Sequence, residues 1–250
     1  MTYLLAGLLT FPITAALTIA GVGAAFILIP VFTSLGIDLH QAMAIALLLN
    51  ALAMISASLR YARKKLILWK LSIPLIVATV IGAPIGVRLG YNIDNTAIRI
   101  VFVCFLLFAA IMIFFFHVRR NSAEGTVELN LSRSILGGVA GLGVGMLAGL
   151  IGVGGGNIIL PTLIALGIKP REAVGTTALV VVFTSISGFV SHVGVGNLDA
   201  LLIVVTAGAS IAGAVVGSWL MTDKLNPDTI KKILGGVLVA VAIKMIINFF

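Results

Sequence analysis

The chain has 250 residues, of which 60% are hydrophobic and only 10% are charged, and its formal net charge is +8. Soluble domains carry about 25% charged residues, so this composition excludes a soluble globular protein and predicts a multi-pass protein of the cell (cytoplasmic) membrane. The basic residues lie in short segments between apolar runs, which is typical of cytoplasmic loops and argues against nucleic-acid binding. A single cysteine, Cys104, excludes a disulfide framework or a cysteine-rich metal centre.

Apolar segments that approach the length of a membrane span recur along the whole chain. The first, residues 1–20, has no basic residue before it and predicts a retained first helix rather than a signal peptide. A spanning helix needs about 20 mostly apolar residues, and six further runs come close to that length: 42–59, 71–87, 100–116, 173–190, 201–220 and 233–247. The chain also holds 28 glycines, which suit close helix packing in lipid. We therefore expect an all-α polytopic membrane protein.

One pattern occurs twice, 131 residues apart and without a gap. The run Gly-Val-Gly-Ala-Ala-Phe-Ile-Leu-Ile-Pro at 21–30 returns as Gly-Val-Gly-Gly-Gly-Asn-Ile-Ile-Leu-Pro at 152–161, and the glycines at 82 and 86 return at 213 and 217. The chain is therefore predicted to contain two copies of one unit. We place the first copy at 1–118, a cytoplasmic linker at 119–132 and the second copy at 133–250. Such internal repeats point to a secondary transporter.

Two topologies compete for this sequence. The segment around each glycine break either crosses the membrane once with a kink, which gives eight crossings, or turns back as two helices or a re-entrant pair, which gives about five segments per copy. The second topology places thirteen of the sixteen Lys and Arg residues on the cytoplasmic side, whereas eight simple crossings divide them nine to seven. The positive-inside rule favours the topology with thirteen basic residues on the cytoplasmic side, that is, about five segments per copy. A unit with an odd number of segments, used twice, gives inverted repeats.

The predicted substrate site lies at the glycine breaks, because backbone amides at a helix start carry partial positive charge and bind anions. Glycine lets a backbone approach a ligand closely, and Asn and Thr side chains add neutral polar groups. The same residues also admit a bland explanation, since glycine and hydroxyl residues in membrane helices often only pack. The substrate-binding candidates are Gly21, Gly23, Asn50, Gly152, Gly154, Gly155, Gly156, Asn157, Thr176 and Thr177.

Two ionisable residues at the ends of apolar runs are secondary candidates. Arg60 is interpreted as a cytoplasmic anchor or as a guide for anions, and His192 as a polar end residue or as a proton acceptor near neutral pH. Carboxylates are nearly absent from the apolar runs, which argues against a relay of buried acids. No metalloprotease or serine-hydrolase motif is present, so neither an enzyme nor a cofactor nor a metal site is expected.

The segment 149–161, Gly-Leu-Ile-Gly-Val-Gly-Gly-Gly-Asn-Ile-Ile-Leu-Pro, followed by Ala-Val-Gly-Thr-Thr-Ala at 173–178, resembles the sulfite exporter TauE/SafE family. The resemblance covers essentially the whole chain. It implies a membrane transporter of small sulfur-containing anions such as sulfite and organosulfonates, with transport coupled to an ion gradient. On the family's motif fall Gly152, Gly154, Gly155, Gly156, Asn157, Pro161, Gly175 and Thr176.

The first copy departs from this motif, because Ala24, Ala25 and Phe26 stand where the second copy has Gly155, Gly156 and Asn157. The combined expectation is a secondary transporter that moves sulfite or an organosulfonate by alternating access, with a proton or cation as the coupling partner. Two alternatives stay open: a transporter of another small anion or metabolite, and a membrane scaffold that transports nothing. A scaffold predicts no symmetric broken segments, so the glycine breaks favour transport.

Overall fold

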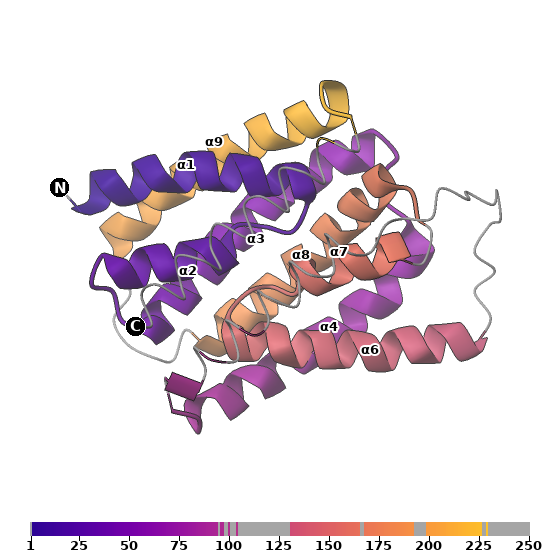
Figure 1. Cartoon of the computed structure of the whole chain (residues 1–250), viewed down its shortest axis with the longest axis horizontal. Helices are drawn as coiled ribbons and strands as arrows, with labels where there is room; N and C mark the ends of the chain where they lie inside the picture. The colour runs from indigo at the N-terminus through magenta and orange to yellow at the C-terminus, as the bar shows by residue number, and fades with distance from the viewer. Residues whose placement is uncertain are drawn as a thin grey trace.

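The structure is a computed structural model that describes residues 2–94, 96, 97, 100, 104, 131–165, 168–192, 199–226 and 229. Every regular element within these residues is an α-helix (Figure 1). The helices are α1 (Thr2–Ala20), α2 (Ala25–Ser34), α3 (Leu39–Arg63), α4 (Trp69–Tyr91), α6 (Leu131–Ile151), α7 (Gly156–Ala165), α8 (Pro170–His192) and α9 (Ala200–Asp223). The predicted all-α class is therefore confirmed.

Five of the described helices, α1, α3, α4, α8 and α9, are long and apolar enough to cross a membrane. In the two central helices, α3 and α8, the share of residues buried inside the protein is about twice that in α4 and α9. The α4 face that carries Ile73, Val77, Ile81 and Ile85 is exposed, as expected of a surface that contacts lipid. The protein is a multi-pass membrane protein. Of the predicted span at 100–116 the structure describes only residues 100 and 104, and the predicted span at 233–247 lies outside the described residues.

The two halves of the chain have matching helix boundaries. Adding 131 to the bounds of α2 gives the bounds of α7, and α1 and α6 end at equivalent residues, Ala20 and Ile151. The helix α6 begins at Leu131, so the last two residues of the predicted linker 119–132 are helical, and the rest of that linker lies outside the described residues.

The first helix of each half packs on the fourth helix of the other half, so that α1 lies along α9 and α6 lies along α4. A Cβ atom added at Gly86 of α4 would lie 2.7 Å from the Met146 carbonyl carbon of α6. Gly217 of α9 is just as tightly placed against the main chain at Ala15 of α1. These glycines permit backbone contact between helices, as small residues do in membrane bundles.

The ends of the bundle differ in chemistry. Arg60 of α3 contacts α9 at Asp223, and Thr176 near the start of α8 accepts a hydrogen bond from the Leu68 amide before α4. We call this the basic end. At the other end, which we call the histidine end, lie the start of α3 at His40 and the ends of α4 and α8.

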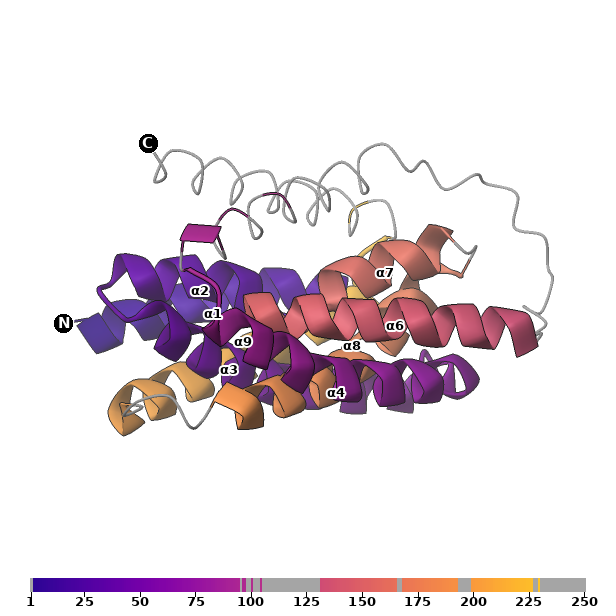
Figure 2. The same cartoon turned by 90° about the horizontal axis from the view of Figure 1, so that it is seen from below.

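The equivalent helices α3 and α8 therefore run in opposite directions. The two short helices also diverge: α2 runs from the interior toward the histidine end, and α7 runs toward the basic end (Figures 1 and 2). Their starts consequently lie near the middle of the bundle. The half-length helices α2 and α7 have 10 residues each, about 15 Å, so each covers roughly half of a bilayer core.

Candidate functional site

The glycine breaks before α2 and α7 both close on one side chain, that of Asn50. Gly23 and Gly154 have φ angles of 78° and 77°, in the left-handed region that favours glycine. A Cβ atom at Gly23 would lie 2.7 Å from Asn50 Nδ2 and closer still to its Oδ1. A Cβ atom at Gly154 would lie 2.7 Å from the same nitrogen. Both positions next to the Asn50 amide must therefore be glycine, because any side chain there would clash with it.

Asn50 is fully buried near the middle of α3, about 17 Å along the helix axis from its first residue. Its Nδ2 donates a hydrogen bond of 2.9 Å to Oγ of Ser185 on α8, which links the two halves of the chain. Its Oδ1 has no hydrogen-bond partner. A buried acceptor without a donor costs about 1–3 kcal/mol, so Oδ1 marks a place where a donor is missing.

The two breaks also touch each other. A Cβ atom at Gly156, the first residue of α7, would lie 2.6 Å from the Val22 carbonyl oxygen in the first break. The start of α2 has no side-chain cap, since Ala24 occupies the N-cap position. Amides in the first turn of a helix have no acceptor within that helix. The starts of α2 and α7 thus bring two sets of such amides close together in the protein interior, where their partial positive charges favour binding of an anion.

Two further polar side chains are buried without partners. Asn157, in the first turn of α7, is 2% exposed, and neither its Nδ2 nor its Oδ1 has a hydrogen-bond partner. Thr177 is fully buried in the first half of α8, and its Oγ1 is also unpaired. Buried polar groups normally find partners. Together with Asn50, these two residues are the substrate-binding candidates with buried polar atoms that lack a hydrogen-bond partner.

The remaining predicted glycines pack against neighbouring helices. Gly21 lies against the Val174 main chain of α8, and its equivalent Gly152 lies against the Met43 side chain of α3. Gly155 faces Val144 and Ala148 on α6. All three have positive φ angles, so they shape the breaks without facing Asn50. Thr176 also has a structural contact, since its Oγ1 accepts the Leu68 amide at 3.0 Å.

The structure places Arg60 and His192 at opposite ends of the bundle, away from Asn50. Arg60 is ten residues beyond Asn50 on α3, about 15 Å along the axis. Its guanidinium pairs with Asp223 and donates to Thr222 Oγ1 at 3.0 Å. His192 ends α8 and lies 3.1 Å from the Tyr91 hydroxyl through Nδ1. Neither residue belongs to the group around Asn50.

Sequence reasoning missed Ser185 as a site residue. Its equivalent in the first copy is Met54, so a search for polar residues repeated in both copies passes over it. The sequence signal for Ser185 was a group of hydroxyl residues in the second half of α8. Two others of this group, Thr184 and Ser187, instead donate hydrogen bonds to α4, at Thr79 Oγ1 and at the Val80 carbonyl. Within the described residues, no three His, Cys, Asp or Glu side chains gather as a metal site requires.

Comparison with known proteins identifies the family. The family described as "Sulfite exporter TauE/SafE" matches residues 3–245. The chain is 26% identical over 216 residues to the probable membrane transporter protein YdhB of Bacillus subtilis, which covers 84% of this chain and 87% of that protein. No solved structure matches.

Other relatives match over shorter segments. The probable membrane transporter protein YjnA of Bacillus subtilis is 36% identical over 115 residues, which cover 44% of this chain and 45% of that protein. Sulfite exporter TauE/SafE family protein 1 of Arabidopsis thaliana is 30% identical over 104 residues, or 40% of this chain and 23% of that protein. The names of the family and of these relatives describe exporters or probable membrane transporters, and the family match covers nearly the whole chain. This chain therefore belongs to the sulfite exporter TauE/SafE family of membrane transporters.

Proposed function

We propose that the protein is a secondary transporter of a small sulfur-containing anion, sulfite or an organosulfonate, which binds where α2 and α7 begin. One observation carries the proposal: two glycine breaks from the two halves of the chain converge on Asn50 in the middle of the bundle. The names of the family and of the Arabidopsis relative support sulfite as the first substrate to test.

The chemistry of this region suits an anion that is bound without a cationic side chain. Sulfite and sulfonate oxygens accept several hydrogen bonds, and the first-turn amides of α2 and α7 supply donors of the right sign. The unpaired Asn157 Nδ2 adds a side-chain donor, and the Thr177 hydroxyl adds a second. In a dry interior these dipoles act more strongly than they would in water, because the local dielectric constant is low.

Alternating access is supported by the arrangement of the two halves. Equivalent helices α3 and α8 run in opposite directions, as inverted repeats require. The candidate site lies between the halves, where Val22 of one break contacts Gly156 of the other. Rocking one half against the other would open this contact first toward one side of the membrane and then toward the other. We assign the basic end to the cytoplasm by the positive-inside rule.

Thermal unfolding of the purified protein with a panel of anions tests the proposal. The panel holds sulfite, sulfate, thiosulfate, sulfoacetate, taurine, acetate and phosphate. A ligand at about 100 times its dissociation constant stabilises by about 2.7 kcal/mol. Sulfite or a sulfonate is expected to raise Tm, and Asn157→Ala should remove the shift. The matched control is Asn92→Ala, which alters an exposed asparagine at the end of α4.

The other outcomes separate the alternatives. A shift with acetate or phosphate alone would indicate a transporter of another anion. No shift with any anion at tens of millimolar would contradict the proposal and favour the scaffold. A sulfite shift that survives in Asn157→Ala would move the binding site away from the start of α7.

A further inference from the structure

Three aromatic rings from three helices meet at the histidine end. His40 of α3 stacks on Tyr91 of α4, with ring centroids 5.2 Å apart and planes at 18°. His192 of α8 meets the same tyrosine ring edge-on at 5.8 Å, and its Nδ1 lies 3.1 Å from the tyrosine hydroxyl oxygen. We call these three residues the His–Tyr–His cluster. It joins both halves of the chain, because α3 and α4 belong to the first and α8 to the second.

Both imidazoles of the His–Tyr–His cluster have a buried nitrogen without a partner. His192 is 3% exposed, and its Nε2 makes no hydrogen bond, nor does His40 Nε2. If the tyrosine hydroxyl donates to His192 Nδ1, then Nε2–H is a donor without an acceptor. If Nδ1–H donates to the hydroxyl, then Nε2 is an acceptor without a donor. Neither neutral form of His192 is fully paired in this closed arrangement.

Among the residues that the structure describes, few charged side chains face these rings. On α3, Asp38 Oδ1 lies 4.0 Å from His40 Nδ1, and the Asp38 side chain is largely exposed while it caps that helix. From α4 the facing titratable group is Tyr91, and from α6 it is only the main chain at Gly149, since the described side chains of α6 carry no charge. Among the described residues, the other imidazole near His192 is that of His40, which contacts the same Tyr91 ring.

The basic end has an equivalent framework with different chemistry. Subtracting 131 maps His192 onto Tyr61 and Gly149 onto Thr18, and the Tyr61 hydroxyl donates to the Thr18 carbonyl at 2.7 Å. The equivalent of Tyr91 is Thr222, which binds Arg60. Ion pairs of Asp223 with Arg60 and Lys64 hold this end together. The basic end is thus held by ion pairs, whereas two imidazoles meet at the histidine end.

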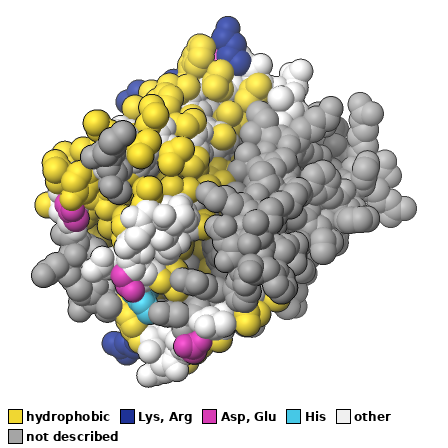
Figure 3. All heavy atoms as spheres, turned by 60° about the vertical axis from the view of Figure 1, so that its left-hand side comes forward, with side chains coloured by type: hydrophobic (Ala, Val, Ile, Leu, Met, Phe, Trp, Pro, Cys, Tyr) yellow, Lys and Arg dark blue, Asp and Glu magenta, His cyan; other side chains and the backbone are white. Residues whose placement is uncertain are grey.

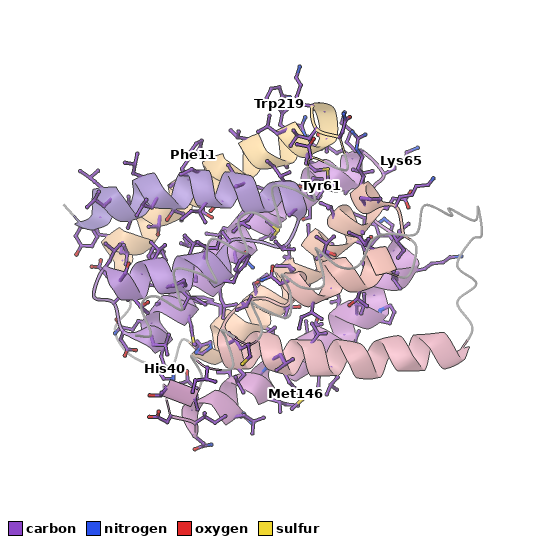
Figure 4. The ribbon with its side chains drawn as sticks, in the orientation of Figure 1. Phe11, His40, Tyr61, Lys65, Met146 and Trp219 are labelled. Carbon is purple, nitrogen blue, oxygen red and sulfur yellow. The ribbon has the colours of Figure 1, made fainter. Side chains whose placement is uncertain are left out.

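Figure 4 shows His40 and Lys65 at opposite ends of the bundle, with Tyr61 toward the basic end. Figure 3 brings the histidine end forward and shows acidic and histidine side chains there beside a broad hydrophobic surface. Equivalent positions at the two ends of the bundle therefore hold a cluster with two histidines at one end and a set of ion pairs at the other.

We propose that the His–Tyr–His cluster is a proton-binding gate, through which protonation of His192 and His40 opens the histidine end and couples transport to pH. The proposal rests on the alternating-access transport proposed above, and it names the proton as the coupling ion. No residue of the cluster lies in the anion site around Asn50, so the two sites are distinct in position.

The sign of the effect follows from the contacts. The closed cluster offers the His192 imidazole the tyrosine oxygen and faces it with the Gly149 main chain, but it keeps the ring 3% exposed. A cation removed from water is costly even where hydrogen-bond acceptors are near. A second proton on His40 adds like charge across the same ring. Opening admits water, which solvates both cations. The open state therefore binds more protons than the closed state, and by linkage acid favours opening.

Accessibility of a cysteine behind the gate tests this without any substrate. Met43 is 2% exposed, lies one turn beyond His40 on α3 and packs against Gly152 in the second break. Met43→Cys in a Cys104→Ser background leaves one cysteine in the full chain, because Cys104 is the natural one. Labelling of the detergent-purified protein with a maleimide is measured at pH 5.5, 6.5 and 7.5, in parallel with the same chain carrying His192→Gln.

Taking the ratio of the parent rate to the His192→Gln rate cancels the pH dependence of the thiol itself. The expected ratio rises about fivefold or more from pH 7.5 to pH 5.5, because the parent gate gains the His192 proton on opening and the His192→Gln gate does not. Tyr91→Phe is the second variant; it keeps the ring contacts, removes the hydroxyl and is expected to shift the pH midpoint of labelling. His40→Gln is expected to flatten the response if His192→Gln fails to fold.

A ratio that stays flat or falls toward acid, with an unshifted midpoint in Tyr91→Phe, overturns the proton gate. Sulfite stabilisation with a flat labelling ratio would reject the gate and keep the proposed anion site. A labelling response without stabilisation by any anion would reject the anion site and keep the gate.

Discussion

Replacing Gly23 by alanine tests the convergence of the two breaks on Asn50. Gly36 is the matched control, because it also has a positive φ, 88°, and an added Cβ there meets nothing within 4 Å. A left-handed backbone costs a residue with a side chain about 1–2 kcal/mol. Gly36→Ala should therefore lower the free energy of unfolding by that amount alone. Gly23→Ala must also displace a fully buried amide.

The extra cost in Gly23→Ala arises from the contacts of Asn50. Its side chain would have to move away from Ser185 and lose their 2.9 Å hydrogen bond. Leaving buried polar groups unpaired costs about 1–3 kcal/mol, so Gly23→Ala is expected to destabilise by about 2–5 kcal/mol in total. Each kcal/mol lowers Tm by about 2–4 °C in chains of this size. Gly23→Ala should also weaken sulfite stabilisation, which Gly36→Ala should leave intact.

Thermal unfolding of the two variants in the same detergent, with and without sulfite, provides the measurement. Equal losses of Tm in Gly23→Ala and Gly36→Ala would refute the contact with Asn50 as a source of stability. Unchanged sulfite stabilisation in a folded Gly23→Ala protein would place the anion elsewhere.

Three further predictions concern the framework. Gly86→Leu should prevent close packing of α4 on α6 and yield little folded protein, whereas Gly143→Leu, where an added Cβ meets nothing within 4 Å, should fold normally; size-exclusion chromatography distinguishes them. Asp223→Asn should lower Tm slightly at low salt, and the difference from the parent should shrink at about 1 M salt, where exposed ion pairs are screened. The hydrogen bond from Tyr3, with those from the α9 amides, lowers the pKa of Asp199, so Asp199→Ala should lower Tm at neutral pH. The difference in Tm between Asp199→Ala and the parent should vanish as the pH falls through that lowered pKa. A difference that stays constant with pH would contradict the contact.

Much of the fold could be predicted from the sequence because membrane helices are coded by composition. The glycine breaks at 21–24 and 152–155 were visible from the repeated pattern, and the structure begins α2 and α7 directly after them. A half-length helix of 10 residues is short for a span, so periodicity alone did not determine its path. That path was inferred from loop charges.

The site was harder to predict because its contacts join residues far apart in sequence. Asn50 was a candidate, yet its partner Ser185 lies 135 residues later on another helix. Thr176 matched the family motif but is used to hold the start of α4. The contact between His40 and Tyr91 depends on where α3 begins and α4 ends in space, which no spacing in the sequence encodes.

Flux of sulfite into proteoliposomes that contain the purified full chain tests the central claim most directly. The expected result is saturable uptake above that of protein-free vesicles, lost in Asn157→Ala and retained in Asn92→Ala. Uptake no faster than in protein-free vesicles, from a protein that is folded and inserted, would contradict sulfite transport through the site around Asn50.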